Sequence, residues 1–204
     1  HNTTAGVFTQ DLTGTGAENV IIAGRSDSTY SKISVFVWYN GQLQNQTSQW
    51  FTGNDNVIVG TEPSVKFGDF LGNGKVGMYV APSVDANWAR GYDGAVFLNN
   101  GTSFSRTNFD LGLVWAHDSA VHDFNRDGKD DILTLDYGPN TTIAFSRGDG
   151  TFNVTRNTQQ SALQGASGVA AGDFIGDGTT QIIVTDATTN ANTATQLMSW
   201  SVNG

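Results

Sequence analysis

The chain has 204 residues, of which 38% are hydrophobic and 14% are charged, and its formal net charge is −9. This size and composition suffice for one domain with a substantial core. Its ten Lys and Arg residues are scattered along the chain, whereas nucleic-acid binding needs clustered cations, so we expect no nucleic-acid partner. No apolar run approaches the length of about 18 residues that a membrane span needs, so we also expect no membrane insertion.

Short apolar segments separated by glycine-rich turns recur along the chain, and no stretch keeps a helical period. Each of four copies has a first strand and then a turn with an aspartate, a large apolar residue directly after it, and a glycine five residues after the aspartate. The aspartates are Asp11, Asp69, Asp123 and Asp173, and the glycines are Gly16, Gly74, Gly128 and Gly178. An apolar strand is predicted after each turn, at residues 20–22, 78–80, 132–133 and 182–184. Internal repetition at this period is typical of repeat architectures.

A second turn follows in every copy, because Asn-Gly or Asp-Gly dipeptides are strong signals of a hairpin. They stand at residues 40–41, 100–101, 149–150 and 203–204. Each copy is therefore predicted as a four-stranded antiparallel unit. The predicted fold is an all-β β-propeller of four blades in one domain, residues 1–204, with blades at about residues 5–58, 59–113, 114–163 and 164–204. Gly204 stands where the other copies turn into their last strand, so we expect the fourth blade to lack its outer strand.

The third copy carries a metal-loop pattern, in which side-chain oxygens recur at positions 1, 3, 5 and 9 counted from its aspartate. These residues are Asp123, Asn125, Asp127 and Asp131. Hard oxygen donors at this spacing predict a calcium site. Gly128 follows Asp127 because so sharp a turn needs a residue that tolerates a positive φ. Thr134 stands where an EF-hand has its bidentate glutamate, and the residues after the loop read as a strand, so we expect the loop to join two strands.

The segment 123–132 resembles the FG-GAP/VCBS repeat family, with weaker copies over nearly the whole chain. Repeats of this family form the calcium-bearing propeller of integrin α chains, some fungal lectins, and domains of secreted bacterial and phage proteins and polysaccharide lyases. The resemblance implies that calcium is bound by the side chains of Asp123, Asn125, Asp127 and Asp131 and by the carbonyl of Lys129. Weaker metal candidates are Asp11, Thr13, Thr15, Asn19, Asp173 and Asp177. Family propellers usually close with about seven blades, so a compact four-bladed ring, half of a larger ring and a fragment are all open.

Candidate ligand contacts come from an insertion at residues 86–93 and from a nearby tryptophan. Exposed aromatic faces suit glycan rings, and loops on a rigid scaffold commonly carry binding. The predicted contacts are Trp88, Arg90, Tyr92 and Trp115. Trp38 and Trp200 occupy equivalent places in two copies and are interpreted as structural.

The leading functional expectation is a calcium-stabilised, extracellular or surface-associated binding or adhesion module that recognises a glycan or a protein and is not catalytic. No catalytic residues are nominated, since residues 117–119 supply the residue types of a triad without its geometry. One alternative is a structural subunit, a homo-oligomer or polymer, that completes its last blade with a strand from a neighbour. The other is a polysaccharide lyase-type enzyme on a propeller scaffold.

Overall fold

The computed structural model of the chain describes residues 6–25, 30–59, 64–81, 94–109, 116–136, 141–156, 166–186 and 196–199. These residues form antiparallel β-sheets, and their single helix, α1 (Thr47–Trp50), is one turn long. The all-β prediction is therefore confirmed. No helix among the described residues has the length and apolar character needed to cross a membrane.

The first sheet has the order β1-β2-β3-β4, and β5 adds to it by pairing with β3. Its strands are β1 (Gly6–Gln10), β2 (Asn19–Arg25), β3 (Tyr30–Tyr39), β4 (Gln42–Asn45) and β5 (Val57–Val59). The repeat pattern predicts the first four strands and gives no sign of β5 or α1. Both lie in the connection to the second sheet, where Trp50 of α1 packs against Phe104 with ring centroids 4.9 Å apart.

The second and third sheets each have the predicted order of four consecutive strands. The second contains β6 (Val65–Gly68), β7 (Gly77–Val80), β8 (Gly94–Asn99) and β9 (Phe104–Phe109). The third contains β10 (Ala116–His122), β11 (Asp131–Asp136), β12 (Thr141–Ser146) and β13 (Phe152–Thr155). Among the described residues the fourth sheet has three strands, β14 (Ala166–Gly172), β15 (Gln181–Asp186) and β16 (Gln196–Ser199).

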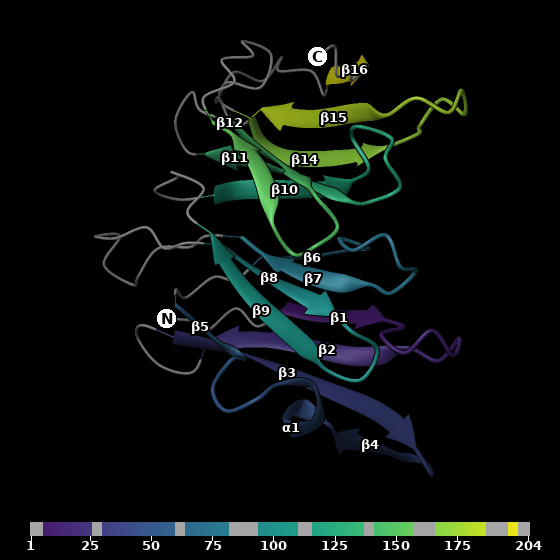
Figure 1. The fold of residues 1–204 in the computed structure, drawn as a ribbon, viewed down its shortest axis with the longest axis vertical. Helices are drawn as coiled ribbons and strands as arrows, with labels where there is room; N and C mark the ends of the chain where they lie inside the picture. The colour runs from purple at the N-terminus through teal and green to yellow at the C-terminus, as the bar shows by residue number, and fades with distance from the viewer. Residues whose placement is uncertain are drawn as a thin grey trace.

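The four sheets follow one another in a row, with the first and the fourth at opposite ends (Figure 1). The first strands of consecutive sheets contact each other along this row. Phe8 of β1 meets Phe67 of β6 at 6.0 Å between ring centroids, and Lys66 Nζ of β6 lies 2.9 Å from Asp118 Oδ1 of β10. Val169 of β14 in turn donates its main-chain N–H to Asp118 Oδ2 at 3.0 Å. The described sheets thus form an open row, and a compact four-bladed ring is not observed.

Each pair of consecutive sheets encloses its own apolar cluster, so the core is divided into three layers. The first layer includes Leu12 and Phe97, the second Phe70 and Ile132, and the third Phe124 and Ile182. A hydrogen-bonded pair of side chains also crosses from the second sheet to the third, where the Tyr79 hydroxyl lies 3.0 Å from Thr134 Oγ1. Burial raises the pKa of Tyr79, which therefore stays neutral. Cohesion between sheets comes mainly from these buried faces.

Candidate metal centre

The turns between the first two strands of each sheet share one backbone conformation. We name them loop 1 (residues 11–19), loop 2 (69–77), loop 3 (123–131) and loop 4 (173–181), and count positions from the aspartate. Positions 4 and 6 have positive φ in every loop, at Gly14 and Gly16, Gly72 and Gly74, Arg126 and Gly128, and Gly176 and Gly178. The sequence repeat therefore encodes a backbone repeat, including in the loops that lack most predicted metal ligands.

The aspartate at position 1 holds this conformation by accepting main-chain N–H groups. In loop 3, Asp123 Oδ1 accepts from Asp127 N at 3.1 Å and Asp123 Oδ2 accepts from Gly128 N at 2.8 Å. Oδ2 of the equivalent aspartate accepts from the position 6 glycine in loops 1, 2 and 4, at 2.6, 2.6 and 2.8 Å. The conserved geometry explains why an aspartate stands at position 1 of every loop, with or without metal.

Position 9 has a structural role that the metal interpretation did not predict. Asp131 is fully buried, and its two carboxylate oxygens accept from Phe124 N at 3.0 Å and Ser146 N at 2.8 Å. Neutral side chains do the same work in two other loops, where Asn19 accepts from Leu12 N and Gln181 accepts from Phe174 N. The signal in the sequence is the polar residue that begins the second strand in each of these three loops.

The outer part of loop 3 carries the remaining predicted ligands. Asn125 Oδ1 accepts from Asp127 N at 3.0 Å, and Asp127 Oδ1 accepts from Lys129 N at 3.0 Å. Lys129 Nζ lies 2.9 Å from Asp127 Oδ2, so an ammonium group occupies one side of this carboxylate. Desolvation works against ionisation here, but hydrogen bonds from Lys129 and Asn125 outweigh it and lower the pKa of Asp127.

The donor chemistry of loop 3 fits calcium, since two outer carboxylates, an amide oxygen and a main-chain carbonyl stand on one tight turn. Among the described residues, no three carboxylate, imidazole or thiol groups lie close enough together to hold a metal ion. Calcium at the Asp127 carboxylate would compete with the Lys129 ammonium group that lies against it.

Among the weaker metal candidates, some side-chain oxygens lie close together and others are already occupied by hydrogen bonds within their own loop. In loop 1, Thr13 Oγ1 lies 3.0 Å from Asp11 Oδ1 and 2.8 Å from Thr15 Oγ1, so three neutral or acidic oxygens do come together. In loop 4, Asp177 Oδ1 already accepts from the main-chain N–H and the hydroxyl of Thr179. Asp173, at position 1 of loop 4, accepts the main-chain N–H of Gly178. The predicted ligand contacts Trp88, Arg90, Tyr92 and Trp115 lie outside the described residues.

Neighbouring loops contact each other along one edge of the row. Asp69 of loop 2 donates its N–H to Asp130 Oδ2 at 2.7 Å, and Asp130 N donates to the Asp69 carbonyl at 3.0 Å. Thr180 of loop 4 lies with its hydroxyl 3.5 Å from the Asp123 carbonyl. A movement of loop 3 on binding calcium would therefore alter these contacts with loops 2 and 4.

The left-handed residue of loop 3 yields a stability prediction. Arg126 has φ 62°, where the other three loops have glycine at φ 66–74°. Replacing Arg126 with glycine is expected to raise the free energy of unfolding by about 0.5–1 kcal/mol relative to Arg126→Ala, because only glycine adopts this conformation without a Cβ penalty. Arg126→Ala is the matched control for the lost charge, and urea unfolding measures both. Equal stabilities would contradict the backbone assignment.

The buried Asp131 carboxyl group predicts a pH dependence in the absence of calcium. Burial raises its pKa to about 7, against the opposing hydrogen bonds from Ser146 and Phe124. An unfolded aspartate titrates near 3.9, so the stabilisation is complete below about pH 4 and is lost as the pH rises through about 7. We expect a loss of up to about 4 kcal/mol over this range in a chelator, at about 1.36 kcal/mol for each pKa unit. Comparison with Asp131→Asn by urea unfolding at each pH isolates this group, and a difference that does not vary with pH would contradict it.

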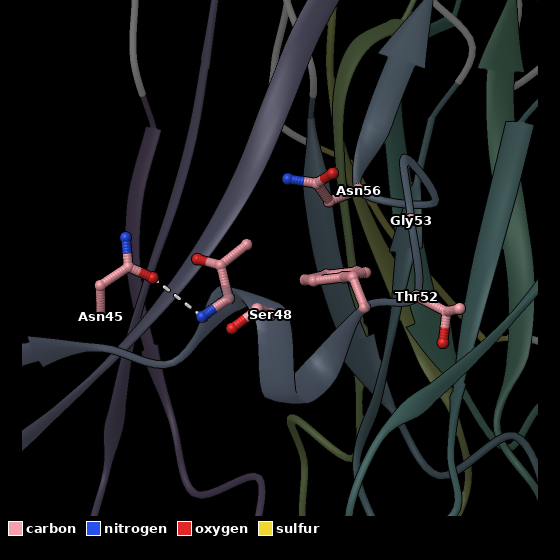
Figure 2. A pocket seen from close by; sticks show the side chains of 7 residues that line it. Asn45, Ser48, Thr52, Gly53 and Asn56 are labelled. Carbon is pink, nitrogen blue, oxygen red and sulfur yellow. Dashed lines mark hydrogen bonds between the residues drawn. The ribbon is translucent and has the colours of Figure 1, made fainter.

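A separate open cavity of about 670 Å³ lies beside α1 in the first sheet. It is lined by Asn45, Thr47, Ser48, Phe51, Thr52, Gly53 and Asn56. Figure 2 shows Ser48 on the helix between Asn45 and the side of the cavity that carries Thr52 and Asn56. The lining offers amides and hydroxyls and carries no charged side chain. The sequence pattern gave no sign of this cavity, because α1 stands outside the repeat.

Comparison with known families agrees with the loop geometry. Residues 123–184 match the model of a family described as FG-GAP-like repeat, so this part of the chain carries an FG-GAP-like repeat. The matched segment runs from loop 3 into β15 and includes loop 4. No curated protein matches the chain.

Proposed function

We propose that this FG-GAP-like repeat chain is a calcium-stabilised, non-catalytic binding module that works outside the cell and recognises a glycan or protein ligand. Its sheets would be blades of a β-propeller, with the loops between first and second strands along one edge. The order of strands in each sheet and the contacts between successive first strands support this fold.

The observation that carries ligand recognition is the neutral cavity beside α1. Ser48 and Thr52 are exposed hydroxyl groups, and Asn45 and Asn56 add amide groups. Such groups both donate and accept hydrogen bonds, as the hydroxyl groups of a sugar do, and specificity in binding sites commonly rests on a few such groups. Within the proposal, a glycan is therefore favoured over a charged ligand.

Calcium would be held by Asp123, Asn125, Asp127 and Asp131 through side chains and by Lys129 through its carbonyl. When bound, the ion would supply positive charge that offsets the repulsion between these carboxylates. Asp123 and Asp131 hold the loop through main-chain amides in either state. This role is structural, because the cavity beside α1 lies in the first sheet and loop 3 in the third.

A glycan array in calcium tests the recognition proposal. The wild-type chain is expected to bind a set of neutral glycans, and Ser48→Arg is expected to abolish binding because a long, charged side chain then projects from the lining into the space for the ligand. Gln49→Arg is the matched control, since Gln49 is exposed on the same turn of helix and is not part of the lining. Trp88→Ala tests the other predicted contact. Failure to bind glycans, or equal binding by both arginine variants, would count against the cavity as the site.

A further inference from the structure

The joints between consecutive sheets follow one pattern. The apolar residue at loop position 2 is covered by the next sheet, and Leu12, Phe70 and Phe124 are only 1%, 1% and 3% exposed. Phe70 packs against Phe152 of the third sheet at 6.1 Å between ring centroids. Leu12 belongs to the same apolar cluster as Phe104 of the second sheet. Burial at this position therefore depends on a following sheet.

The covering sheet uses the same two positions at both well-described joints. Asn99 and Ser146 end the third strand of their sheets and pair across the hairpin with Phe104 and Phe152. Asn99 Nδ2 donates to the Leu12 carbonyl at 2.8 Å, and Ser146 Oγ donates to the Phe70 carbonyl at 2.6 Å. A joint thus consists of a hydrogen-bond donor and an adjacent apolar residue over loop position 2.

In loop 4 the apolar residue at position 2 is present, but no sheet among the described residues packs over it. Phe174 stands at position 2 and is 46% exposed, and Ile175 beside it is 57% exposed. Loop 4 has the same positive φ at positions 4 and 6 and the same hydrogen bond from the position 6 glycine to the aspartate as the other loops, so its turn is formed in the same way. At this end of the row Phe174 is therefore exposed, whereas the residue at the same position is buried in the other three loops.

At the other end of the row, the first sheet has the donor and the apolar residue that would cover a preceding loop. Counted along the register with the second strand, Trp38 takes the place of Asn99 and Ser146, although β3 continues for one more residue, Tyr39. Trp38 pairs across its hairpin with Leu43, as Asn99 does with Phe104 and Ser146 with Phe152. They are 67% and 45% exposed, whereas Asn99, Ser146 and Phe104 are buried. The Trp38 indole N–H is a hydrogen-bond donor, as are the groups of Asn99 and Ser146 that reach the preceding loop.

A third position matches the joint between the second and third sheets, whereas the second sheet has Val76 there. At loop position 8, Asp130 accepts the N–H of Asp69, which is position 1 of the preceding loop. Glu18 stands at position 8 of loop 1, is exposed, and carries the same acceptor group. The first sheet thus presents a donor and an apolar residue at the positions used at both joints, and a carboxylate at the position used at the joint between the second and third sheets.

We propose that two copies of this chain associate head to tail, with loop 4 of one copy docked on the exposed end face of the first sheet of the other. Leu43 covers Phe174, the Trp38 indole N–H meets the Phe174 carbonyl, and Glu18 accepts the main-chain N–H of Asp173. The same contact made twice about a twofold axis closes a ring of eight sheets, which is within the range of about four to eight blades found in propellers. The contact needs no exchanged strand and is independent of the proposed ligand.

Analytical ultracentrifugation over a range of protein concentrations tests the association. The wild-type chain is expected to form a dimer, and Trp38→Ser or Phe174→Ser is expected to raise the dissociation constant by roughly tenfold or more, since buried aromatic residues dominate such contacts. Tyr39→Ser is the matched control. Tyr39 is 58% exposed and follows Trp38 in β3, so its side chain points to the opposite face of the strand and its loss should leave the dimer intact.

Cysteine cross-linking determines which surfaces meet, and the chain contains no cysteine of its own. Leu43→Cys and Ile175→Cys are made as separate variants and mixed under mild oxidation. A heterodimeric disulfide in the mixture, with little product from either variant alone, is the expected result. Gln49→Cys mixed with Ile175→Cys is the control that should not link. A chain that stays monomeric at every concentration, or a dimer unaffected by Trp38→Ser and Phe174→Ser, would overturn the proposal.

Discussion

Replacing Phe70 with alanine is expected to lower the free energy of unfolding by about 3–5 kcal/mol, the usual cost of removing a fully buried phenylalanine. Phe70 is 1% exposed and belongs to the apolar cluster between the second and third sheets. Its ring contacts Phe152, and its carbonyl accepts the Ser146 hydroxyl. The substitution leaves a cavity in the joint itself, so urea unfolding followed by tryptophan fluorescence should show the loss directly.

Phe174→Ala provides the comparison, because it changes the same residue at the same loop position. With Phe174 46% exposed, its truncation should cost less than about 1 kcal/mol when measured on the monomer. The measurement is therefore made at a protein concentration at which copies are separate. Similar losses in the two variants would mean that loop position 2 is not stabilised by the following sheet, and would remove the basis for the joint pattern.

The repeat in the sequence predicted the strand order of the sheets because its signals are local. An aspartate at position 1 bonds to main-chain amides within its own loop, and a glycine at position 6 supplies a positive φ there. The Asn-Gly and Asp-Gly turns likewise depend on their own residues. Features of this kind can be predicted from one sequence, since nothing distant is needed to form them.

The features that the repeat did not predict depend on contacts between sheets. The strand Val57–Val59 has only three residues and pairs with the first three residues of β3, Tyr30–Lys32, outside the four strands that the repeat predicts. The helix α1 is held by Trp50 against Phe104 of the second sheet. The exposure of Trp38 was also not predicted, because equivalence with Trp200 says nothing about whether a neighbouring sheet covers it.

The metal interpretation combined two roles that the structure separates. A carboxylate at position 9 matches a calcium loop, but the same carboxylate is a main-chain acceptor in loop 3, and Asn19 and Gln181 perform that task without charge. Sequence spacing cannot distinguish the two roles, because both require an oxygen atom at the start of the second strand. A variant that keeps the hydrogen-bond acceptor at position 9 and removes its charge distinguishes the structural role from the metal-binding role.

Calcium at about 1 mM is expected to raise the melting temperature by roughly 5–10 °C over the value in chelator. Binding at about 100 times the dissociation constant stabilises the folded state by about 2.7 kcal/mol, and each kcal/mol shifts the midpoint of a chain of this size by about 2–4 °C. Calorimetry in calcium, in magnesium and in chelator measures the shift. An unchanged melting curve in chelator would contradict a calcium site.

Three variants then assign the response to loop 3 and to particular side chains. Asp127→Ala is expected to abolish the rise, because Asp127 has no main-chain acceptor role outside its own turn. Asp149→Ala, in an exposed turn of the same sheet, should leave it unchanged, since the Asp149 carboxylate bonds only within that turn to Thr151. Asp131→Asn keeps an acceptor for Phe124 N, as Asn19 does for Leu12 N, so the fold should persist. Loss of the calcium response in this variant would make Asp131 a ligand as well as a structural acceptor, whereas a retained response would confine calcium to the outer residues of the loop.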